Sequence, residues 1–265
     1  MLHAAIRFAY DGSQFDAYAR DPHARTVEGC LQEALEPAGY IAGTIKTGSR
    51  TDARVSALEN VVRCAFDRRH LRGFVPGVQK HLPMGLWVTA AAVVPEQWNP
   101  RHALDRTYRY DAPDLGEDPR RLEAAWRAFE GTHDMRAFAR LEAGRDPVRR
   151  ILACSLEGPE DGHWRLRVTS PGFLWNQVRR MVDAALAVGR GEAAVTDIRE
   201  SLRSGRPHRA FELASPEGLL LERVRYEGLA WDPDAGGLGR DRIVRGLQAA
   251  RVRHAVMSHL RELAL

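Results

Sequence analysis

The stretch GSRTDARVSA, residues 48–57, joins two runs that are predicted to be β-strands, TIKTGS at 44–49 and NVVRCAFD at 60–67. Small and turn-forming residues fill this loop, and one carboxylate, Asp52, stands between Arg50 and Arg54. An aspartate in such a loop commonly caps a turn. Two flanking guanidinium groups would also keep Asp52 ionised at neutral pH, which suits a carboxylate nucleophile. The residues alone leave both interpretations open.

Strand and helix patterns follow one another on both sides of this loop. Strand patterns occur at HAAIRFAY (3–10), GLWVTAAAVV (85–94), RTYRYDAP (106–113) and GLLLERVRY (218–226). A hairpin is predicted from RRILACSLEG (149–158) and HWRLRVTSPGFL (163–174). Helical spacing of apolar residues occurs at TVEGCLQEALEPAG (26–39), RRLEAAWRAFEG (120–131), WNQVRRMVDAALAVGRG (175–191), VTDIRESLRSG (195–205) and a basic segment at 242–263. Thr26 is the predicted N-cap of the helix at 26–39, and Thr196 is the predicted N-cap of the helix at 195–205.

The order of these elements predicts an α+β fold built from two similar α/β halves. Helices would cover one side of a largely antiparallel sheet. We expect an N-terminal half at 1–105 that carries the Asp52 loop, and a C-terminal half at 106–265 that carries Tyr108 and Arg179.

Composition narrows the class of protein. The chain has 265 residues, a formal charge of +4 and 39 basic residues, of which only Lys46 and Lys80 are lysine. Arginine binds phosphates and stacks on bases, although a biased genome also produces this preference. Three scattered cysteines, no CxxC and no HExxH argue against a metal site or a disulfide framework. No signal peptide, long apolar run or phosphate-binding glycine loop occurs, so we expect a cytoplasmic protein without a membrane span.

Two further segments carry candidate functional residues. In RTYRYD, Tyr108 and Tyr110 share one face of a strand, either as core aromatics or as a base-stacking platform flanked by Arg106 and Arg109. In NQVRRMVD, Arg179 either forms a solvated helical ion pair with Asp183 or serves as the partner of a catalytic carboxylate.

These segments, taken in order, resemble the TruA-type tRNA pseudouridine synthases, and the archaeal members in particular. The resemblance rests on YDGSQFDAYAR (10–20), SRTDARVSALENVV (49–62), NPRHALDRTYRY (99–110), FLWNQVRRMV (173–182) and GLLLERVRY (218–226). It spans roughly residues 4 to 227, which is most of the chain.

The resemblance implies two α/β halves that share a continuous sheet, a basic central cleft, and a homodimer that binds tRNA without a cofactor or metal. Carried over by position, Asp52 matches the catalytic aspartate, Tyr108 the tyrosine that packs on the target base, and Arg179 the arginine that pairs with the aspartate. Arg50 and Thr51 match substrate-binding neighbours of the aspartate, and Arg20 and Arg25 fall where RNA contacts are expected. The implied reaction is isomerisation of uridine to pseudouridine in the anticodon arm, around tRNA positions 38–40.

Two alternative functions are considered beside this one. Arg54 and Asp183 stand where the family usually has glycine, which favours a tRNA-binding protein of the same fold with reduced or lost catalysis. A bulky residue at 54 would be strained if the backbone there needs a positive φ. A glycoside hydrolase would need a second acid, for which Glu59 is the nearby candidate.

Overall fold

A computed structural model of the chain describes residues 1–232, and the helix predicted at 242–263 lies outside the described residues. Contacts group the chain into two compact units. Of the described residues, the first unit contains Met1–Arg50, Asn60–Arg101 and 228–232, and the second contains Thr51–Glu59 and His102–Glu227. Thr51–Glu59 therefore groups with the second unit although it lies early in the sequence. The division predicted at residue 106 stays a prediction.

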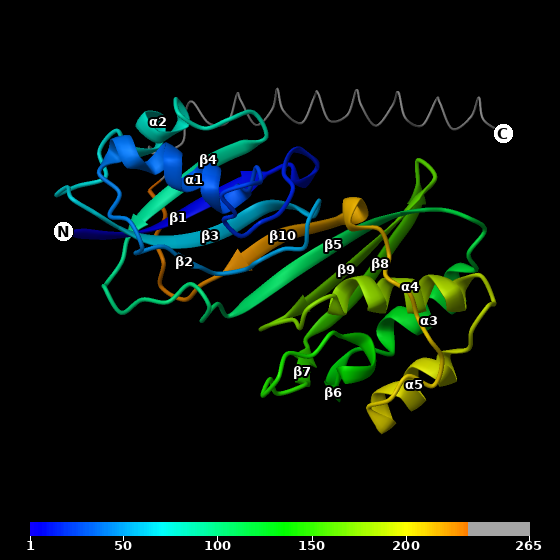
Figure 1. Cartoon of the computed structure of the whole chain (residues 1–265). Helices are drawn as coiled ribbons and strands as arrows, with labels where there is room; N and C mark the ends of the chain where they lie inside the picture. Colours follow the sequence, from blue (N-terminus) through cyan, green and yellow to red (C-terminus); the bar gives the residue numbers. More distant parts are fainter. Residues whose placement is uncertain (233–265) are drawn as a thin grey trace. The chain divides into compact units, whose positions relative to one another are not determined.

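The first unit is a small sheet with two helices (Figure 1, blue to cyan). Its strands are β1 (Leu2–Tyr10), β2 (Lys46–Thr47), most of β3 (Ser56–Phe66) and β4 (Leu86–Val93); its helices are α1 (Val27–Leu35) and α2 (Phe74–Gln79), with short 3-10 turns at Gly12–Gln14 and Glu36–Ala38. β1 pairs antiparallel with β4. The Thr26 hydroxyl accepts a hydrogen bond from the Gly29 N–H and so caps α1, as predicted.

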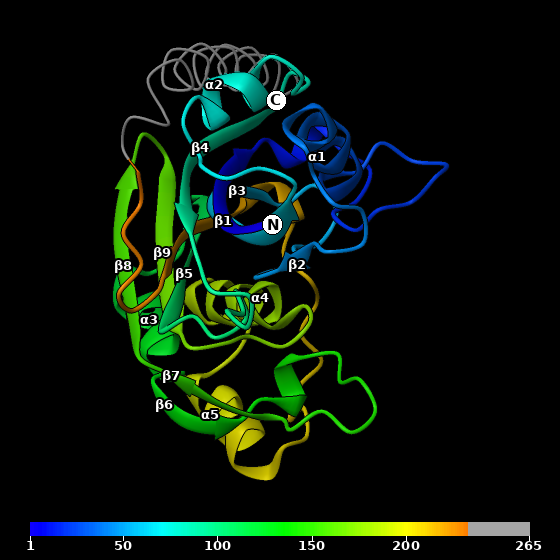
Figure 2. The ribbon, with the colours of Figure 1, turned by 90° about the vertical axis from the view of Figure 1, so that its left-hand side faces the viewer.

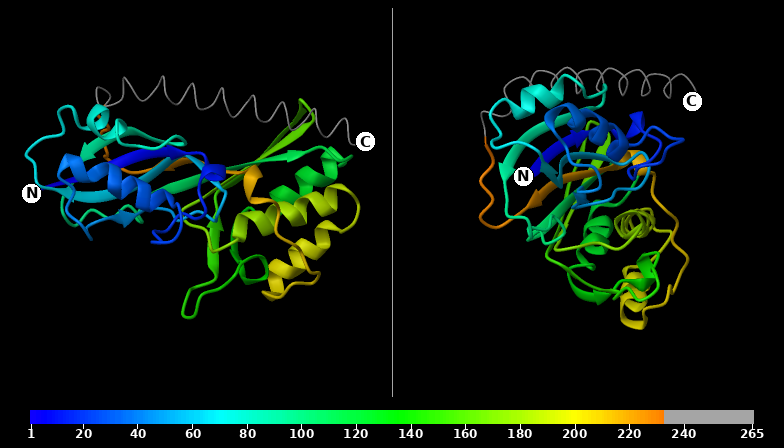
Figure 3. Two further views of the ribbon diagram at one scale, coloured as in Figure 1. Left: turned by 45° about the horizontal axis from the view of Figure 1, so that its top comes forward. Right: turned by 60° about the vertical axis from the view of Figure 1, so that its left-hand side comes forward.

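The second unit has more helix. Its strands are β5 (Asp105–Pro113), β6 (Gly131–Asp134), β7 (Val148–Ile151), β8 (Ala153–Glu160), β9 (His163–Ser170) and β10 (Leu219–Arg225). Its helices are α3 (Pro119–Arg127), α4 (Gln177–Gly189) and α5 (Val195–Ser204), with 3-10 turns at Arg136–Phe138 and Pro216–Gly218. Figure 2 shows β5, β8 and β9 nearly edge-on with α4 on one side, and Figure 3 shows the three helices packed together.

Hydrogen bonds connect one eight-stranded sheet in the order β4-β1-β3-β10-β5-β9-β8, with β2 beside β3. β10 pairs parallel with the start of β3, and its pairing with β5 is antiparallel. The mixed α/β class and the mostly antiparallel sheet are thus confirmed. The basic central cleft stays a prediction. No helix within residues 1–232 is long and apolar enough to cross a membrane.

The core of the second unit follows the period-two pattern of its strands. Trp164, Leu166 and Val168 of β9 are buried, and the residues between them are half-buried. The indole N–H of Trp126 in α3 donates to the Arg167 carbonyl at 2.9 Å, which fastens the helix to the sheet. This packing holds α3, against which α4 packs, on the sheet that carries Tyr108.

The hairpin predicted from 149–158 and 163–174 is confirmed, because β8 pairs antiparallel with β9. Its first strand is shorter than predicted, since Val148–Ile151 is a separate strand that pairs with β6. The predicted cap of α5 is wrong. Thr196 is not the N-cap of α5, since Ala194 has the extended cap conformation and its N–H donates to the Asp197 carboxylate at 2.8 Å. Asp197 therefore caps this helix from inside the first turn.

Candidate active site

Asp52 begins a tight turn just before β3. Its carbonyl accepts a hydrogen bond from the Val55 N–H at 3.2 Å. Arg54, the third residue of this turn, has a φ of 68°, whereas Ala53, the second residue, does not have a positive φ. That combination is typical of a type II turn, which favours glycine at its third position. Val55 is buried and anchors the turn, so the Asp52 carboxylate is fixed at the start of a strand.

The Asp52 carboxylate pairs with Arg179 of α4. Arg179 Nη1 donates to Asp52 Oδ2 at 2.9 Å, across 127 positions of sequence. The two side chains are only 13% and 21% exposed, for Arg179 and Asp52 respectively. An ion pair with limited access to water is screened less than a surface pair. The structure therefore brings together two residues that were predicted to act together.

Arg179 is held by a second contact that the sequence did not predict. Its Nε donates to the Ala214 carbonyl at 2.7 Å. The segment that carries Ala214 is itself fastened to α4, because Arg180 donates to the Phe211 carbonyl at 3.2 Å and Asp183 accepts the Glu212 N–H at 2.7 Å. Asp183 thus bonds to this backbone, whereas the carboxylate that Arg179 contacts is Asp52.

Tyr108 lies on β5 and is 9% exposed. Its ring meets Phe173 edge to face, with 5.3 Å between centroids and 88° between planes. Burial raises the pKa of Tyr108 to about 12; the Arg106 guanidinium opposes this rise and the Asp52 carboxylate adds to it. The effect of Asp52 on this phenol indicates that the two groups lie in the same electrostatic environment.

Tyr110 lies two residues further along β5. Burial raises its pKa to about 12, and the Arg179 guanidinium opposes the rise. A Cβ at Gly218 would lie 2.6 Å from Tyr110 Cζ, so only glycine fits at this point. Arg109, on the opposite face of the strand, bonds to Asp111 at 2.9 Å and lies 3.8 Å from Glu222. It therefore does not flank the two tyrosines.

Arg54 makes an ion pair with Glu217, with Nε 2.5 Å from Oε1. Glu217 also accepts the Ser215 hydroxyl, and this hydrogen bond, ahead of the Arg54 contact, lowers the pKa of Glu217. Both side chains of the ion pair are about half exposed. The pair ties the strained turn that carries Asp52 to the 3-10 turn that precedes β10.

The predicted substrate-binding residues divide between the two units. Thr51 is half-buried and belongs to the second unit with Asp52. Arg50 is exposed and ends a segment of the first unit. Arg20 donates to Gln32 at 3.1 Å, and Arg25 donates to the Met84 carbonyl at 3.2 Å and lies over the Phe15 ring. Arg50, Arg20 and Arg25 all belong to the first unit.

Sequence reasoning missed the residues that support the site: Phe173, Ala214, Ser215 and Glu217. Ala214 acts through its backbone carbonyl, which leaves no mark on the residue type. Glu217 follows Ser215 and Pro216 in a segment that reads as an ordinary turn. The one usable signal was the bulky Arg54 at a glycine position, which marked this turn as strained and as a place to look for supporting contacts.

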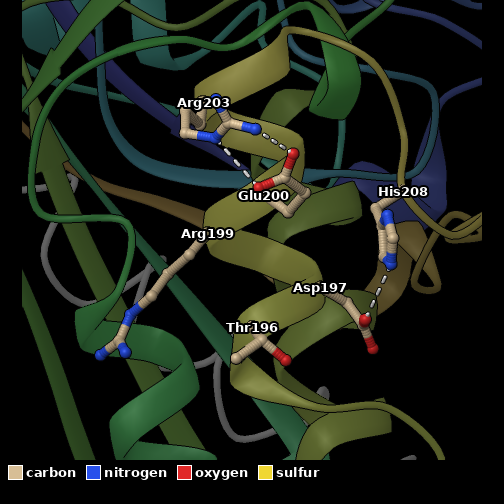
Figure 4. Close-up of a pocket in the computed structure, with 6 residues that line it drawn as sticks. All are labelled: Thr196, Asp197, Arg199, Glu200, Arg203 and His208. Carbon is tan, nitrogen blue, oxygen red and sulfur yellow. Dashed lines mark hydrogen bonds and ion pairs between the residues drawn. The ribbon is translucent and has the colours of Figure 1, made fainter.

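A shallow pocket on α5 contains another cluster of charged side chains. It is lined by Thr196, Asp197, Arg199, Glu200, Arg203 and His208. Figure 4 shows Glu200 facing Arg203 and Asp197 facing His208. None of the predicted site residues lines this pocket. Its carboxylates are paired with neighbours along or beside the same helix, which is the pattern of a solvated helical face.

Comparison with known proteins agrees with the sequence patterns. The family described as tRNA pseudouridine synthase matches residues 125–227. The tRNA pseudouridine synthase A of Thermococcus onnurineus is 36% identical over 243 residues, which is 89% of this chain and 90% of the relative. The enzyme of the same name from Methanocella arvoryzae is 38% identical over 239 residues, 88% of each chain. That from Pyrococcus furiosus is 33% identical over 245 residues, 89% of this chain and 88% of the relative.

Proposed function

Because this chain belongs to the tRNA pseudouridine synthase family, we propose that it isomerises uridine to pseudouridine in the anticodon arm of tRNA, around positions 38–40. The single observation that supports this best is the shielded contact between Asp52 and Arg179, in the same electrostatic environment as Tyr108. A carboxylate that is held by an ion pair and partly shielded from water is suited to nucleophilic attack.

The reaction rearranges one nucleotide and consumes nothing. The N1–C1′ bond of uridine breaks, the base turns, and C5 bonds to C1′. The proton on C5 is lost, and N1 gains a proton. Asp52 acts as the nucleophile, either at C1′ of the ribose or at C6 of the uracil ring, and leaves again when the new bond has formed. No redox step occurs, so the residues need only bind and orient the nucleotide, supply the nucleophile and carry protons.

Each candidate residue has a role in this proposal. Arg179 pairs with the Asp52 carboxylate and aims it, because the Arg179 guanidinium is itself fixed by the Ala214 carbonyl. Tyr108 packs against the uracil once the nucleotide has left its stack. Its phenol stays neutral at physiological pH, since burial raises its pKa.

The substrate is held mainly through its phosphates. Arg50, Thr51, Arg20 and Arg25 are proposed to contact the RNA backbone, which would make binding strongly dependent on salt. Shape then selects the tRNA, as expected for structured RNA. As the family resemblance implies, we propose a homodimer acting in the cytoplasm, and sedimentation of the chain with and without tRNA tests the dimer.

A tRNA-binding protein with lost catalysis is the second candidate. One observation favours it: Arg54 has the positive φ that glycine adopts more readily. Asp183 no longer supports it, because its carboxylate bonds to the Glu212 N–H and leaves the Arg179 contact with Asp52 intact.

The proposed function is tested by mapping the product. An unmodified tRNA transcript is incubated with the protein, treated with a carbodiimide that marks pseudouridine, and copied by reverse transcriptase. Stops around positions 38–40 that depend on the protein are expected. A transcript that binds the protein but shows no new stop would favour the binding protein.

A further inference from the structure

Trp175 is an exposed tryptophan on a part of the second unit that the proposed reaction does not use. It is 45% exposed, and no other aromatic side chain within residues 1–232 falls in the exposed class. The remaining tryptophans of this range are buried or half-buried. Leaving a large indole in water forgoes the free energy that its burial would supply. An exposed indole therefore suggests a surface that is covered when a partner binds.

A guanidinium group already lies against this indole. Arg140 Cζ is 4.2 Å from the centre of the Trp175 ring, which is a close cation–π contact. The two backbones are also joined, because the Arg140 N–H donates to the Trp175 carbonyl at 2.9 Å in an isolated antiparallel bridge. The pair is therefore preorganised. Planar indole and guanidinium groups are both surfaces on which nucleic-acid bases stack.

Positive charge surrounds the pair. Residues 140–150 contain Arg140, Arg145, Arg149 and Arg150 against two carboxylates. Arg149 donates to the backbone carbonyls of Asp146 and Val148 at 2.9 and 2.5 Å. Burial lowers the pKa of Arg149, the nearby Arg145 cation lowers it further, and the Asp146 carboxylate opposes this fall. A phosphate beside these two cations would relieve their repulsion.

The chain places this surface close to Tyr108. Phe173, whose ring contacts Tyr108, is two residues before Trp175. Two residues span at most about 7 Å between Cα atoms, so Trp175 lies near Phe173. Because Phe173 contacts Tyr108, Trp175 is also close to the proposed base-binding residue. Trp175 also directly precedes Asn176, the N-cap of the helix that carries Arg179.

We propose that Trp175 and Arg140 form a stacking platform for a nucleotide that flanks the target uridine, and that Arg145 and Arg149 bind a phosphate of the same strand. The inference rests on the proposed function for the identity of the RNA. The platform holds the neighbouring base while the target uridine is out of the stack. It would thereby determine which nucleotides are accepted beside the target.

A fluorescent base tests the platform directly. Two tRNA transcripts carry 2-aminopurine immediately before or immediately after the target uridine, and the protein carries Asp52→Asn so that the RNA stays unconverted. Stacking on an indole quenches this base, so binding should quench one of the two labels. Trp175→Ala in the same background should abolish that quenching and weaken binding by about 5- to 150-fold, the range for losing one stacked base. Trp175→Phe should retain most of both.

Matched controls separate stacking from damage to the fold. Arg120→Ala removes an exposed arginine and Leu115→Ala an exposed apolar side chain of the same unit, and neither should change quenching or affinity. Arg140→Ala should reduce quenching less than Trp175→Ala. If Trp175→Ala, with an unchanged circular dichroism spectrum, binds and quenches as its parent does with both labels, the platform is overturned.

A second readout distinguishes this inference from the proposed function. With Asp52 intact, Trp175→Ala should lower kcat/KM for the tRNA by about 5- to 150-fold and Trp175→Phe by much less. Quenching that depends on Trp175, in a protein that never forms pseudouridine, would leave the platform standing and overturn the catalytic proposal. Normal isomerisation with kcat/KM unaffected by Trp175→Ala would support the catalytic proposal and overturn the platform.

Discussion

Two carboxylate–arginine clusters of the second unit differ in how they are built. Asp52 and Arg179 are 127 residues apart, 21% and 13% exposed, and held by contacts from three segments of chain. Glu200 and Arg203 are three residues apart on α5, 40% and 76% exposed, and contact each other across one helical turn (Figure 4). The hydrogen bond from Arg203 lowers the pKa of Glu200, and the nearby His208 makes a smaller contribution in the same direction.

The difference shows what distinguishes a reactive ion pair from a surface one. Pairs of oppositely charged residues are frequent on helices and contribute little when exposed. A pair that joins distant segments and excludes water must be fixed by the fold, and its geometry is set before a substrate arrives. The Asp52–Arg179 pair meets this condition, and the α5 cluster does not. Five predictions test the contrast, from the largest expected effect to the smallest.

Removing Arg179 should have the largest effect short of removing Asp52 itself. Arg179→Ala leaves a partly shielded carboxylate without its partner and free to turn, and misplacement of this kind costs about 100-fold in kcat. Arg179→Lys keeps the charge but offers no fork that can reach both Asp52 and Ala214, so it should recover only part of the loss. Single-turnover rates with saturating tRNA measure this. Wild-type rates in Arg179→Ala would mean that the Asp52–Arg179 pair is as dispensable for catalysis as the exposed pair of Glu200 and Arg203.

Tyr108 should follow. Tyr108→Ala removes a stacking surface for the uracil and should lower kcat/KM by about 5- to 150-fold, which corresponds to about 1–3 kcal/mol. Tyr108→Phe keeps the ring and its edge contact with Phe173, so it should retain most activity. Equal activity of Tyr108→Ala and wild type would remove Tyr108 from the site.

The pH dependence of these variants checks the same residue. Burial raises the pKa of Tyr108 from 10.0 to about 12. The neutral phenol therefore contributes stability that is complete below pH 10 and is lost as the pH rises through 12. Tyr108→Phe should keep the wild-type activity profile between about pH 6 and 9 and differ only in alkaline unfolding. A changed neutral-pH profile would mean that the hydroxyl takes part in proton transfer.

Arg54 and Glu217 test whether the strained turn limits catalysis. Arg54→Gly removes about 1–2 kcal/mol of backbone strain and loses an exposed ion pair worth about 0.2–1 kcal/mol, so we expect a small gain in stability. Glu217→Gln keeps the strain and loses the pair, so it should destabilise by up to about 1 kcal/mol. Thermal unfolding measures both. Turnover should change only a few-fold; a rise above about tenfold in Arg54→Gly would mean that Arg54 impairs the enzyme, as the binding-protein alternative requires.

The α5 cluster should show no effect. Glu200→Gln and Arg203→Gln break an exposed contact between neighbours on a helix, which has little influence on stability. Activity, tRNA binding and Tm should all stay at the wild-type values. A large loss of activity in either variant would contradict the distinction drawn between the two clusters.

Much of the fold could be predicted because local patterns determine it. The period-two burial of β9 and the Thr26 cap of α1 can be read from neighbouring residues. Predictions failed where two alternatives were locally similar. Thr196 looks like a cap, but Asp197 accepts the Ala194 N–H and the helix begins one residue before Thr196.

The candidate site was predicted through resemblance, with little help from local physics. Asp52 reads first as a turn residue and Arg179 as the helical partner of Asp183, and only the order of several segments suggested otherwise. Asp183 was expected to compete for Arg179, whereas its carboxylate bonds to the Glu212 N–H. The contacts of Ala214 and Glu217 depend on how distant segments meet, which spacing along the chain does not reveal.

The most direct test of the central claim, that Asp52 is the nucleophile, uses tRNA transcript with tritium at C5 of uracil. Joining C5 to C1′ expels that hydrogen, so tritium released to water counts each isomerisation. Wild type and Asp52→Asn are compared at equal tRNA occupancy, which a gel shift establishes. We predict release by wild type, none by Asp52→Asn, and similar binding by both. Release by Asp52→Asn at a rate near that of wild type would contradict the assignment of Asp52.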